Sequence, residues 1–213
     1  MPDEADAART APREVPRWRD LKARVLAGLG LASVAFALLA LGQRSFALLV
    51  LCVGLFMAWE WGRMIRGSTF DIPFYVHAAG VASSVLLALA GYPALGLAAL
   101  GVAALVILGL ELGRKSTMSA QGVFYVGLPA LSLLWLRGDP AYGFWAVLLI
   151  VACVVATDTF AFFTGRQLGG PKLWPAVSPN KTWSGLIGGV TASALVAALF
   201  ALVLPDASVT RLV

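Results

Sequence analysis

Residues 158–189 read DTFAFFTGRQLGGPKLWPAVSPNKTWSGLIGG, a polar segment set between two apolar stretches. The segment opens with Asp158, which lies within the end of an apolar run, and continues through glycines, prolines and cations. An ionisable group inside a hydrophobic segment is costly to desolvate and is therefore a functional candidate. Long connections of this kind are functional or disordered, and Trp174 and Trp183 argue against disorder here.

The composition around this segment is that of a membrane protein. The chain has 213 residues, of which 60% are hydrophobic, and its mean hydropathy is +0.85. These values are too apolar for a soluble domain. The apolar runs are long enough to cross a hydrocarbon core of about 30 Å as helices, and they do not alternate as barrel strands would. We therefore expect an all-α polytopic membrane protein of about seven transmembrane helices, over residues 25–41, 46–62, 74–90, 92–112, 120–136, 142–163 and 184–204.

The placement of the cations predicts the orientation of these helices. Of the 16 lysines and arginines, only Arg44, Arg137 and Arg211 fall on one side of the predicted spans. Cytoplasmic loops carry the excess of positive charge, so the N-terminus is expected in the cytoplasm. Residues 1–24 are then a flexible cytoplasmic tail, residues 25–213 a transmembrane domain, and residues 164–183 a cytoplasmic loop. The tight turn at residues 91–93 joins an antiparallel helix pair on the opposite side.

The loop has the composition of an anion-binding segment. Gly165, Gly169 and Gly170 permit backbone conformations that are closed to other residues, and consecutive N–H groups in such turns bind anions. The segment also offers cations and hydroxyls, and a helix is expected to begin near Trp183, which places Lys181 at a helix N-terminus where phosphate binds. A plain cytoplasmic loop with turn residues explains the same composition equally well. The polar candidates are Arg166, Lys172, Ser178, Lys181 and Thr182.

Other polar residues have simpler interpretations. A membrane aspartate such as Asp158 can pair with a cation or cap a helix instead of acting on a substrate. Glu60 with Arg63, and Glu111 with Arg114 and Lys115, are spaced as ordinary surface pairs. His77, placed near the non-cytoplasmic side, is expected to be packed or hydrogen-bonded. The Gly109/Gly113 and Gly185/Gly189 spacings permit close packing of helices.

The run from Asp158 to Gly185 resembles the central segment of the phosphatidate cytidylyltransferase (CDP-diglyceride synthase) family. That segment reads approximately D-[ST]-G-A-Y-x-x-G-[RK]-x-x-G-x-x-K-L-x-P-x-[IV]-S-P-x-K-T-W-E-G. Sixteen positions match in order, and the Glu60-Trp61 pair resembles the N-terminal half of the family. Phe160, Phe162 and Ser184 depart from the pattern. The matching residues are Asp158, Thr159, Ala161, Gly165, Arg166, Gly169, Lys172, Leu173, Pro175, Val177, Ser178, Pro179, Lys181, Thr182, Trp183 and Gly185.

The resemblance implies a reaction of CTP with phosphatidic acid that gives CDP-diacylglycerol and pyrophosphate. Asp158 would then be a catalytic and metal-binding carboxylate for Mg²⁺ or another divalent cation. Arg166 and Lys181 would also be catalytic, and the substrate-binding residues would be Lys172, Ser178, Thr182, Gly165 and Gly169. The expected partners are CTP, phosphatidic acid and the lipid bilayer of the inner (cytoplasmic) membrane. A homodimer is a further possibility. The net charge of +5 follows from the topology and needs no nucleic acid to explain it.

Alternative functions stay open at this point. A CTP-dependent lipid kinase of the dolichol or phytol type is also a multi-span protein, although the S-P-x-K-T-W spacing favours the cytidylyltransferase. The chain is not a P-loop ATPase, because Asn180 stands where glycine would precede the lysine. A proton-coupled transporter would use Asp158, but no inverted repeat is evident. Family members usually continue beyond the position of Val213 with a further signature. The sequence therefore also fits a fragment or an inactive, truncated paralogue.

Overall fold

The computed structural model describes residues 17–110 and 114–203, and these residues form seven long helices and one short β-hairpin. The all-α membrane fold expected from the sequence is confirmed in this part of the chain. The helices and strands are α2 (Arg17–Ala40), α3 (Gln43–Arg66), α4 (Ile72–Leu89), α5 (Pro93–Leu110), α6 (Arg114–Arg137), α7 (Gly143–Leu168), β1 (Lys172–Trp174), β2 (Ser178–Thr182) and α8 (Trp183–Val203).

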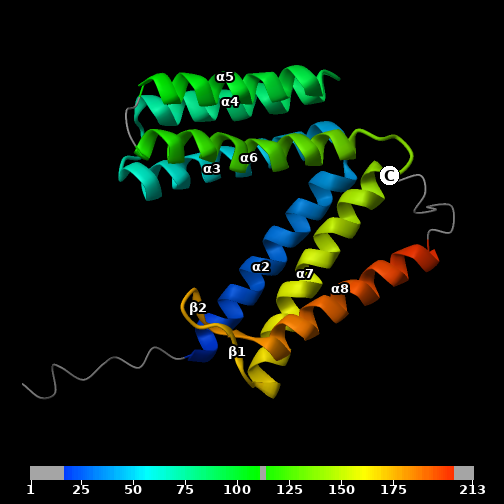
Figure 1. The fold of residues 1–213 in the computed structure, drawn as a ribbon. Helices are drawn as coiled ribbons and strands as arrows, with labels where there is room; N and C mark the ends of the chain where they lie inside the picture. Colours follow the sequence, from blue (N-terminus) through cyan, green and yellow to red (C-terminus); the bar gives the residue numbers. More distant parts are fainter. Residues whose placement is uncertain (1–16, 111–113, 204–213) are drawn as a thin grey trace, which may run out of the picture.

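Helices α3 to α6 form a four-helix bundle in two layers, with α4 and α5 lying over α3 and α6 (Figure 1). Small residues allow the helices to approach closely. Gly80 on α4 faces Ala103 on α5, and the indole of Trp61 on α3 lies against Gly122 on α6. The core of the bundle is apolar, with Val81, Leu100, Ala103, Ala104, Ile107, Ala120, Val123 and Val126 buried together.

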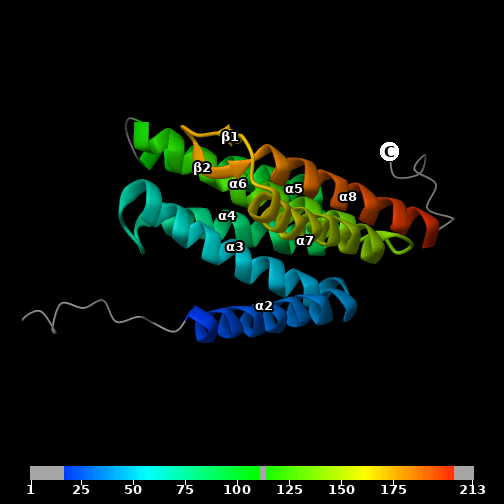
Figure 2. The same cartoon turned by 90° about the horizontal axis from the view of Figure 1, so that it is seen from below.

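Helices α2, α7 and α8 extend away from this bundle (Figure 1). The chain joins α6 to α7 through a turn in which the Asp139 carboxylate accepts hydrogen bonds from the N–H groups of Ala141 and Tyr142. Beside this turn, the Arg137 guanidinium donates to the carbonyl of Leu39 near the end of α2, at 3.0 Å. After its first turns, α7 packs mainly against α8, and the two helices lie side by side in both views (Figure 2).

Six of the helices are long and apolar enough to cross a membrane, judged by length and composition. They are α3, α4, α5, the Ser116–Arg137 part of α6, α7 and α8, and each coincides with a predicted span. The first predicted span, residues 25–41, corresponds to the shorter apolar segment Leu26–Ala40 within α2. The many exposed apolar side chains of these helices are what a lipid-facing surface requires. The chain is therefore a multi-pass membrane protein.

The turn between α4 and α5 is as tight as the sequence predicts. Gly91 has a φ of +89°, and the N–H of Tyr92 donates to the carbonyl of Leu87 at 2.8 Å, which closes the end of α4. Pro93 then begins α5, where its missing N–H removes no helical hydrogen bond. The expected antiparallel pair of helices is confirmed.

Two boundaries and the form of the loop differ from the sequence prediction. The predicted tail reaches residue 24, but α2 begins at Arg17, so residues 17–24 are helical. The predicted loop begins at residue 164, but α7 continues through Gly165 to Leu168 and ends where Gly169 takes a positive φ. The remainder of the loop contains the hairpin β1–β2, where a structureless connection was expected. Some predictions concern residues outside the described part of the chain. These residues are 1–16 of the predicted tail, Glu111 of the predicted surface pair and Gly113 of the predicted glycine motif.

The orientation in the membrane gives the first testable prediction. In a background with Cys52→Ala and Cys153→Ala, we expect Asn180→Cys to react with an impermeant maleimide only from the cytoplasmic face, and Tyr92→Cys only from the opposite face. The native side chains are exposed, Asn180 on the hairpin and Tyr92 in the turn between α4 and α5, so each thiol would be accessible. Labelling of residue 180 from the outer face would contradict the cytoplasmic placement of the hairpin and the access to CTP that depends on it.

Candidate functional site

Asp158 lies on α7 with an exposed side chain, ten residues before the helix ends at Leu168. At 1.5 Å per residue, Asp158 lies about 15 Å from the end of the helix. This distance is longer than the sequence prediction implies, because the predicted loop begins at residue 164. Asp158, Phe162 and Arg166 follow at four-residue intervals and therefore share one face of α7. The guanidinium of Arg166 lies 5.8 Å from the centre of the Phe162 ring. This face carries a carboxylate at depth and a cation near the end of the helix.

Gly165 is part of the contact between α7 and α8, and the sequence prediction that it shapes a loop turn is wrong. It lies within α7 and has no positive φ. A Cβ added at Gly165 would stand 2.9 Å from Thr182 Oγ1 and 3.5 Å from the Cα of Gly185. Gly185 and Gly189 are buried and face α7. The close packing predicted from their spacing is confirmed.

This contact gives a second prediction, on stability. Gly185→Ala should destabilise the fold by about 1–3 kcal/mol, because its Cβ would stand 2.9 Å from the backbone carbonyl of Ala161, which has little freedom to move. Gly109→Ala is the matched control, since nothing lies within 4 Å of a Cβ there. Thermal unfolding in detergent should show a lower midpoint for the first variant and not for the second. Equal midpoints would contradict the close contact between α7 and α8.

Gly169 and Gly170 form the turn that ends α7, and both have the left-handed φ that the sequence predicts. Their φ values are +60° and +100°, a region that favours glycine because it has no Cβ. Within the described part of the chain, the N–H groups of these two residues have no hydrogen-bond partner. Two successive unbonded N–H groups in a positive-φ turn are the main-chain element of an anion-binding nest.

The hairpin presents the remaining cations beside this turn. Lys172 on β1 is paired with Thr182 on β2, and Lys181 precedes Thr182. The side chains of Lys172, Lys181 and Arg166 are exposed, and none of them forms a salt bridge with a described acidic residue. Ser178 is partly buried and pairs with Trp174 at the other end of the hairpin. The segment therefore carries three uncompensated positive charges over residues 166–181.

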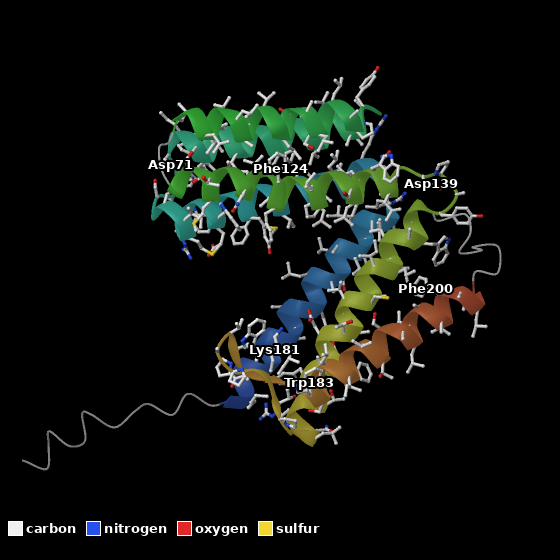
Figure 3. The ribbon with its side chains drawn as sticks, viewed as in Figure 1. Asp71, Phe124, Asp139, Lys181, Trp183 and Phe200 are labelled. Atoms are coloured by element: carbon white, nitrogen blue, oxygen red, sulfur yellow. The ribbon has the colours of Figure 1, made fainter. Side chains whose placement is uncertain are left out.

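Helix α8 begins at Trp183, where the sequence predicts it, and Lys181 lies two residues earlier, on β2 (Figure 3). The hydroxyl of Thr182 accepts a hydrogen bond from the N–H of Gly185 at 3.2 Å and thus caps the helix, as threonine does at helix N-termini. The side chain of Thr182 is buried. Its hydroxyl faces into the protein, whereas the sequence suggested a direct contact with phosphate.

The hydroxyls of Ser184 and Thr164 also belong to the contact between α7 and α8. The sequence pattern indicates neither of these roles, because Ser184 only departs from the family pattern. The Ser184 hydroxyl donates to the carbonyl of Gly169 and lies 3.0 Å from the hydroxyl of Thr182. Thr164 Oγ1 donates within α7 to the carbonyl of Phe160 and lies 3.2 Å from the carbonyl of Ser184. No signal in the sequence indicates the contacts of Ser184 with Gly169 and with Thr164, because they join residues that are 15 and 20 positions apart.

A second polar cluster, also missed, lies at the end of the bundle. The Arg66 guanidinium donates to both carboxylate oxygens of Asp71, at 2.7 and 2.8 Å, and to the hydroxyl of Ser119. The hydrogen bond from Arg66 holds the pKa of the Asp71 carboxyl below its usual value, and Asp71 also caps α4 by accepting from the N–H of Phe74. Asp71 lies far from Lys181 and Trp183 (Figure 3). The cluster therefore joins α3, α4 and α6 and is separate from the hairpin.

Of the residues expected to be structural, Glu60, Arg63 and His77 lie in the described part of the chain. Glu60 and Arg63 form an exposed pair at 3.1 Å, as predicted. His77 is buried, but neither ring nitrogen has a hydrogen-bond partner among the described residues. It also lies near the start of α4, at the end that carries Asp71, and so on the predicted cytoplasmic side. The predicted topology therefore disagrees with the non-cytoplasmic position expected for His77, because α4 starts next to residues 67–71.

The donor set for a metal ion is small. Within residues 17–110 and 114–203, no group of three or more histidine, cysteine, aspartate or glutamate side chains is arranged to hold a metal. Asp158 supplies a single carboxylate. Mg²⁺ keeps several water ligands and is commonly bound by one or two carboxylates together with substrate phosphates. The described residues therefore fit an ion that enters with a phosphate substrate, and among themselves they do not form a closed protein site.

The model of the cytidylyltransferase family matches residues 22–213. The chain belongs to the cytidylyltransferase family. It is 38% identical to a phosphatidate cytidylyltransferase of Brucella melitensis, in a match that covers 85% of this chain and 69% of that protein. It is 30% identical to the phosphatidate cytidylyltransferase of Bacillus subtilis, in a match that covers 86% of this chain and 72% of that protein. It is 37% identical to that of Brucella abortus, in a match that covers 82% of this chain and 65% of that protein. The matches to the two Brucella proteins thus span about two thirds of their length. No solved structure matches the chain.

Membership of this family identifies the reaction class as nucleotidyl transfer. The cytidylyltransferase carries an uncompensated cationic segment next to a membrane helix with a single carboxylate at depth.

Proposed function

We propose that this cytidylyltransferase transfers the cytidylyl group of CTP to phosphatidic acid at the cytoplasmic face of the inner membrane. A phosphate oxygen of the lipid attacks the α-phosphorus of CTP. A new phosphorus–oxygen bond forms, the bond between the α-phosphorus and the oxygen that bridges it to the β-phosphorus breaks, and pyrophosphate leaves with the electron pair of that broken bond. The products are CDP-diacylglycerol, a lipid used in phospholipid synthesis, and pyrophosphate.

The observation that carries this proposal is the group of three cations on residues 166–181, which lack acidic partners in the described chain and lie before and after the Gly169–Gly170 turn in the sequence. Phosphoryl transfer depends mainly on positioning and on neutralising charge at phosphate oxygens. Arg166, Lys172 and Lys181 supply that charge, and the N–H of Gly169 and the Ser178 hydroxyl supply further donors. Gly165 and Thr182 act indirectly. Gly165 lets α7 pack closely against α8, and Thr182 caps the start of α8, next to the residues that carry these groups.

Asp158 is proposed to hold a divalent ion, Mg²⁺ in the simplest case, together with phosphate oxygens of the substrates. The ion would supply charge neutralisation of the pyrophosphate leaving group and of the attacked phosphate. The position of Asp158 below the end of α7 suits a substrate whose head group reaches the surface and whose acyl chains stay in the bilayer. The apolar side chains exposed near it, Phe160, Phe162 and Phe163, provide a surface compatible with acyl chains.

The position of the radioactive label tests the reaction directly. Protein reconstituted with phosphatidic acid, Mg²⁺ and CTP should transfer label from the α-phosphate of CTP into lipid and release the γ-phosphate label as pyrophosphate. Transfer of the γ-phosphate label into a lipid alcohol would instead identify a CTP-dependent lipid kinase. Protein with Asp158→Asn, which should keep its fold and turn over at least about 100-fold more slowly, serves as the control for label transferred by contaminating enzymes.

A further inference from the structure

The junction between the glycine turn and α8 is held by a chain of hydroxyls. The N–H of Gly185 donates to Thr182 Oγ1 at 3.2 Å, Thr182 Oγ1 lies 3.0 Å from Ser184 Oγ, and Ser184 Oγ donates to the carbonyl of Gly169. Each hydroxyl has one proton to donate. Since the Ser184 proton is directed to the Gly169 carbonyl, the proton between the two hydroxyls must come from Thr182. All three hydrogen bonds therefore run in one direction, from the start of α8 to the turn.

The last of these bonds fixes the orientation of the Gly169–Gly170 peptide. The peptide is trans, and in a planar trans peptide the carbonyl and the following N–H point in opposite directions. With the Gly169 carbonyl directed at Ser184, the N–H of Gly170 is directed away from α8. Gly170 is exposed and its N–H has no partner within the described chain, so this donor is available to an external acceptor.

Glycine by itself does not hold such an orientation. Both residues of the turn are glycines with positive φ, and glycine has more backbone freedom than any other residue. The contacts that restrain the turn come from α8: the Ser184 hydroxyl on Gly169, and the N–H of Trp183, which donates to the carbonyl of Pro171 at 3.1 Å. Only the first of them depends on a side chain and can be removed by substitution.

We propose that Ser184 is a positioning residue for the nucleotide. Its hydroxyl orients the Gly169–Gly170 peptide so that the free N–H donor faces the same phosphate as the cations at positions 166, 172 and 181. Ser184 itself does not contact the nucleotide, because its proton is used on Gly169 and its oxygen on Thr182. This inference rests on the proposed function, since it assumes that the hairpin binds CTP.

The test compares Ser184→Ala with Ser184→Thr, which keeps a hydroxyl, and with Ser193→Ala on the same helix. Ser193 is partly buried, and the described structure gives its side chain no hydrogen bond. Two quantities are measured: hydrogen exchange of residues 169–183 without nucleotide, and the dissociation constant for CTP with Mg²⁺. For Ser184→Ala we expect exchange of this segment to become several-fold faster and CTP binding about tenfold weaker. Ser184→Thr should restore both, and Ser193→Ala should change neither.

Turnover adds a readout that a purely structural role would not give. Ser184→Ala should raise the KM for CTP about tenfold and change kcat less than threefold, because the groups that act on the reacting atoms remain. Unchanged exchange and unchanged CTP affinity in Ser184→Ala would overturn the proposal. Faster exchange with unchanged CTP affinity would also overturn it, since the hydroxyl would then only stabilise the turn. Wild-type protein that bound no CTP would contradict the proposed function itself, while the nucleotide-free exchange would still report the hydroxyl contact.

Discussion

Asp158→Asn is expected to lower the turnover of the cytidylyltransferase by at least about 100-fold while leaving its fold intact. The substitution removes one negative charge and hardly changes the size of the side chain. Loss of a charged group that acts in the transition state costs about 3 kcal/mol or more, which corresponds to this factor in rate. Because the Asp158 side chain is exposed on α7 and has no hydrogen bond or salt bridge among the described residues, its removal breaks no structural contact.

The measurement is kcat as a function of Mg²⁺ concentration, together with the thermal midpoint in detergent. We expect a lower kcat and a weaker dependence on Mg²⁺, with a midpoint equal to that of the wild type. Asp139→Asn is a control carboxylate, because Asp139 caps the turn before α7 at the opposite end of the helix. It should lower stability and leave the Mg²⁺ dependence unchanged. If Asp158→Asn turned over at the wild-type rate with unaltered Mg²⁺ dependence, Asp158 would have no catalytic role.

Lys181→Met is expected to weaken CTP binding by about 10- to 100-fold. A hydrogen bond to a charged group contributes about 1.5–3 kcal/mol, and Lys181 is exposed with no acidic partner in the described chain that would offset its loss. Methionine keeps much of the length of the side chain and removes its charge. The expected signature is a higher KM that saturating CTP overcomes, with a smaller effect on kcat.

Arg63→Met is the matched control for this loss of charge. Arg63 is also an exposed cation on the predicted cytoplasmic side, but it is paired with Glu60 and lies 5.0 Å from the centre of the Trp59 ring. Its removal should leave the KM for CTP within about twofold of the wild type. An equal rise in KM for both variants would indicate a general electrostatic attraction at this face and would remove the specific role of the hairpin.

The helices could be predicted from the sequence because each is a continuous apolar run bounded by glycine, proline or charged residues. The boundaries were predicted less well where these signals conflict. Thr164, Arg166 and Gln167 are polar, and their segment is therefore predicted as a loop. The helix nevertheless includes them near its end, where the Thr164 hydroxyl donates to the carbonyl of Phe160. Polarity marks the edge of a membrane and does not mark the end of a helix.

The candidate site was predicted as a set of residues and not as an arrangement. The positive-φ glycines and the start of α8 follow from local rules, and the structure confirms both. The inward direction of Thr182 and the contact of Gly165 with Gly185 could not be predicted, because they depend on how α7 and α8 cross. For the same reason the bond between Ser184 and Gly169, which joins two elements, has no signature in the sequence.

The central claim is that residues 166–182 bind the triphosphate of CTP, and hydrogen exchange with and without nucleotide tests it most directly. The wild-type cytidylyltransferase in lipid nanodiscs would be measured with Mg²⁺ alone and with Mg²⁺ and saturating CTP. We predict slower exchange in peptides that cover Gly169, Gly170 and the hairpin, and no change in the turn at residues 89–93 on the opposite side. Unchanged exchange of residues 166–182 under conditions in which CTP is bound would contradict the account.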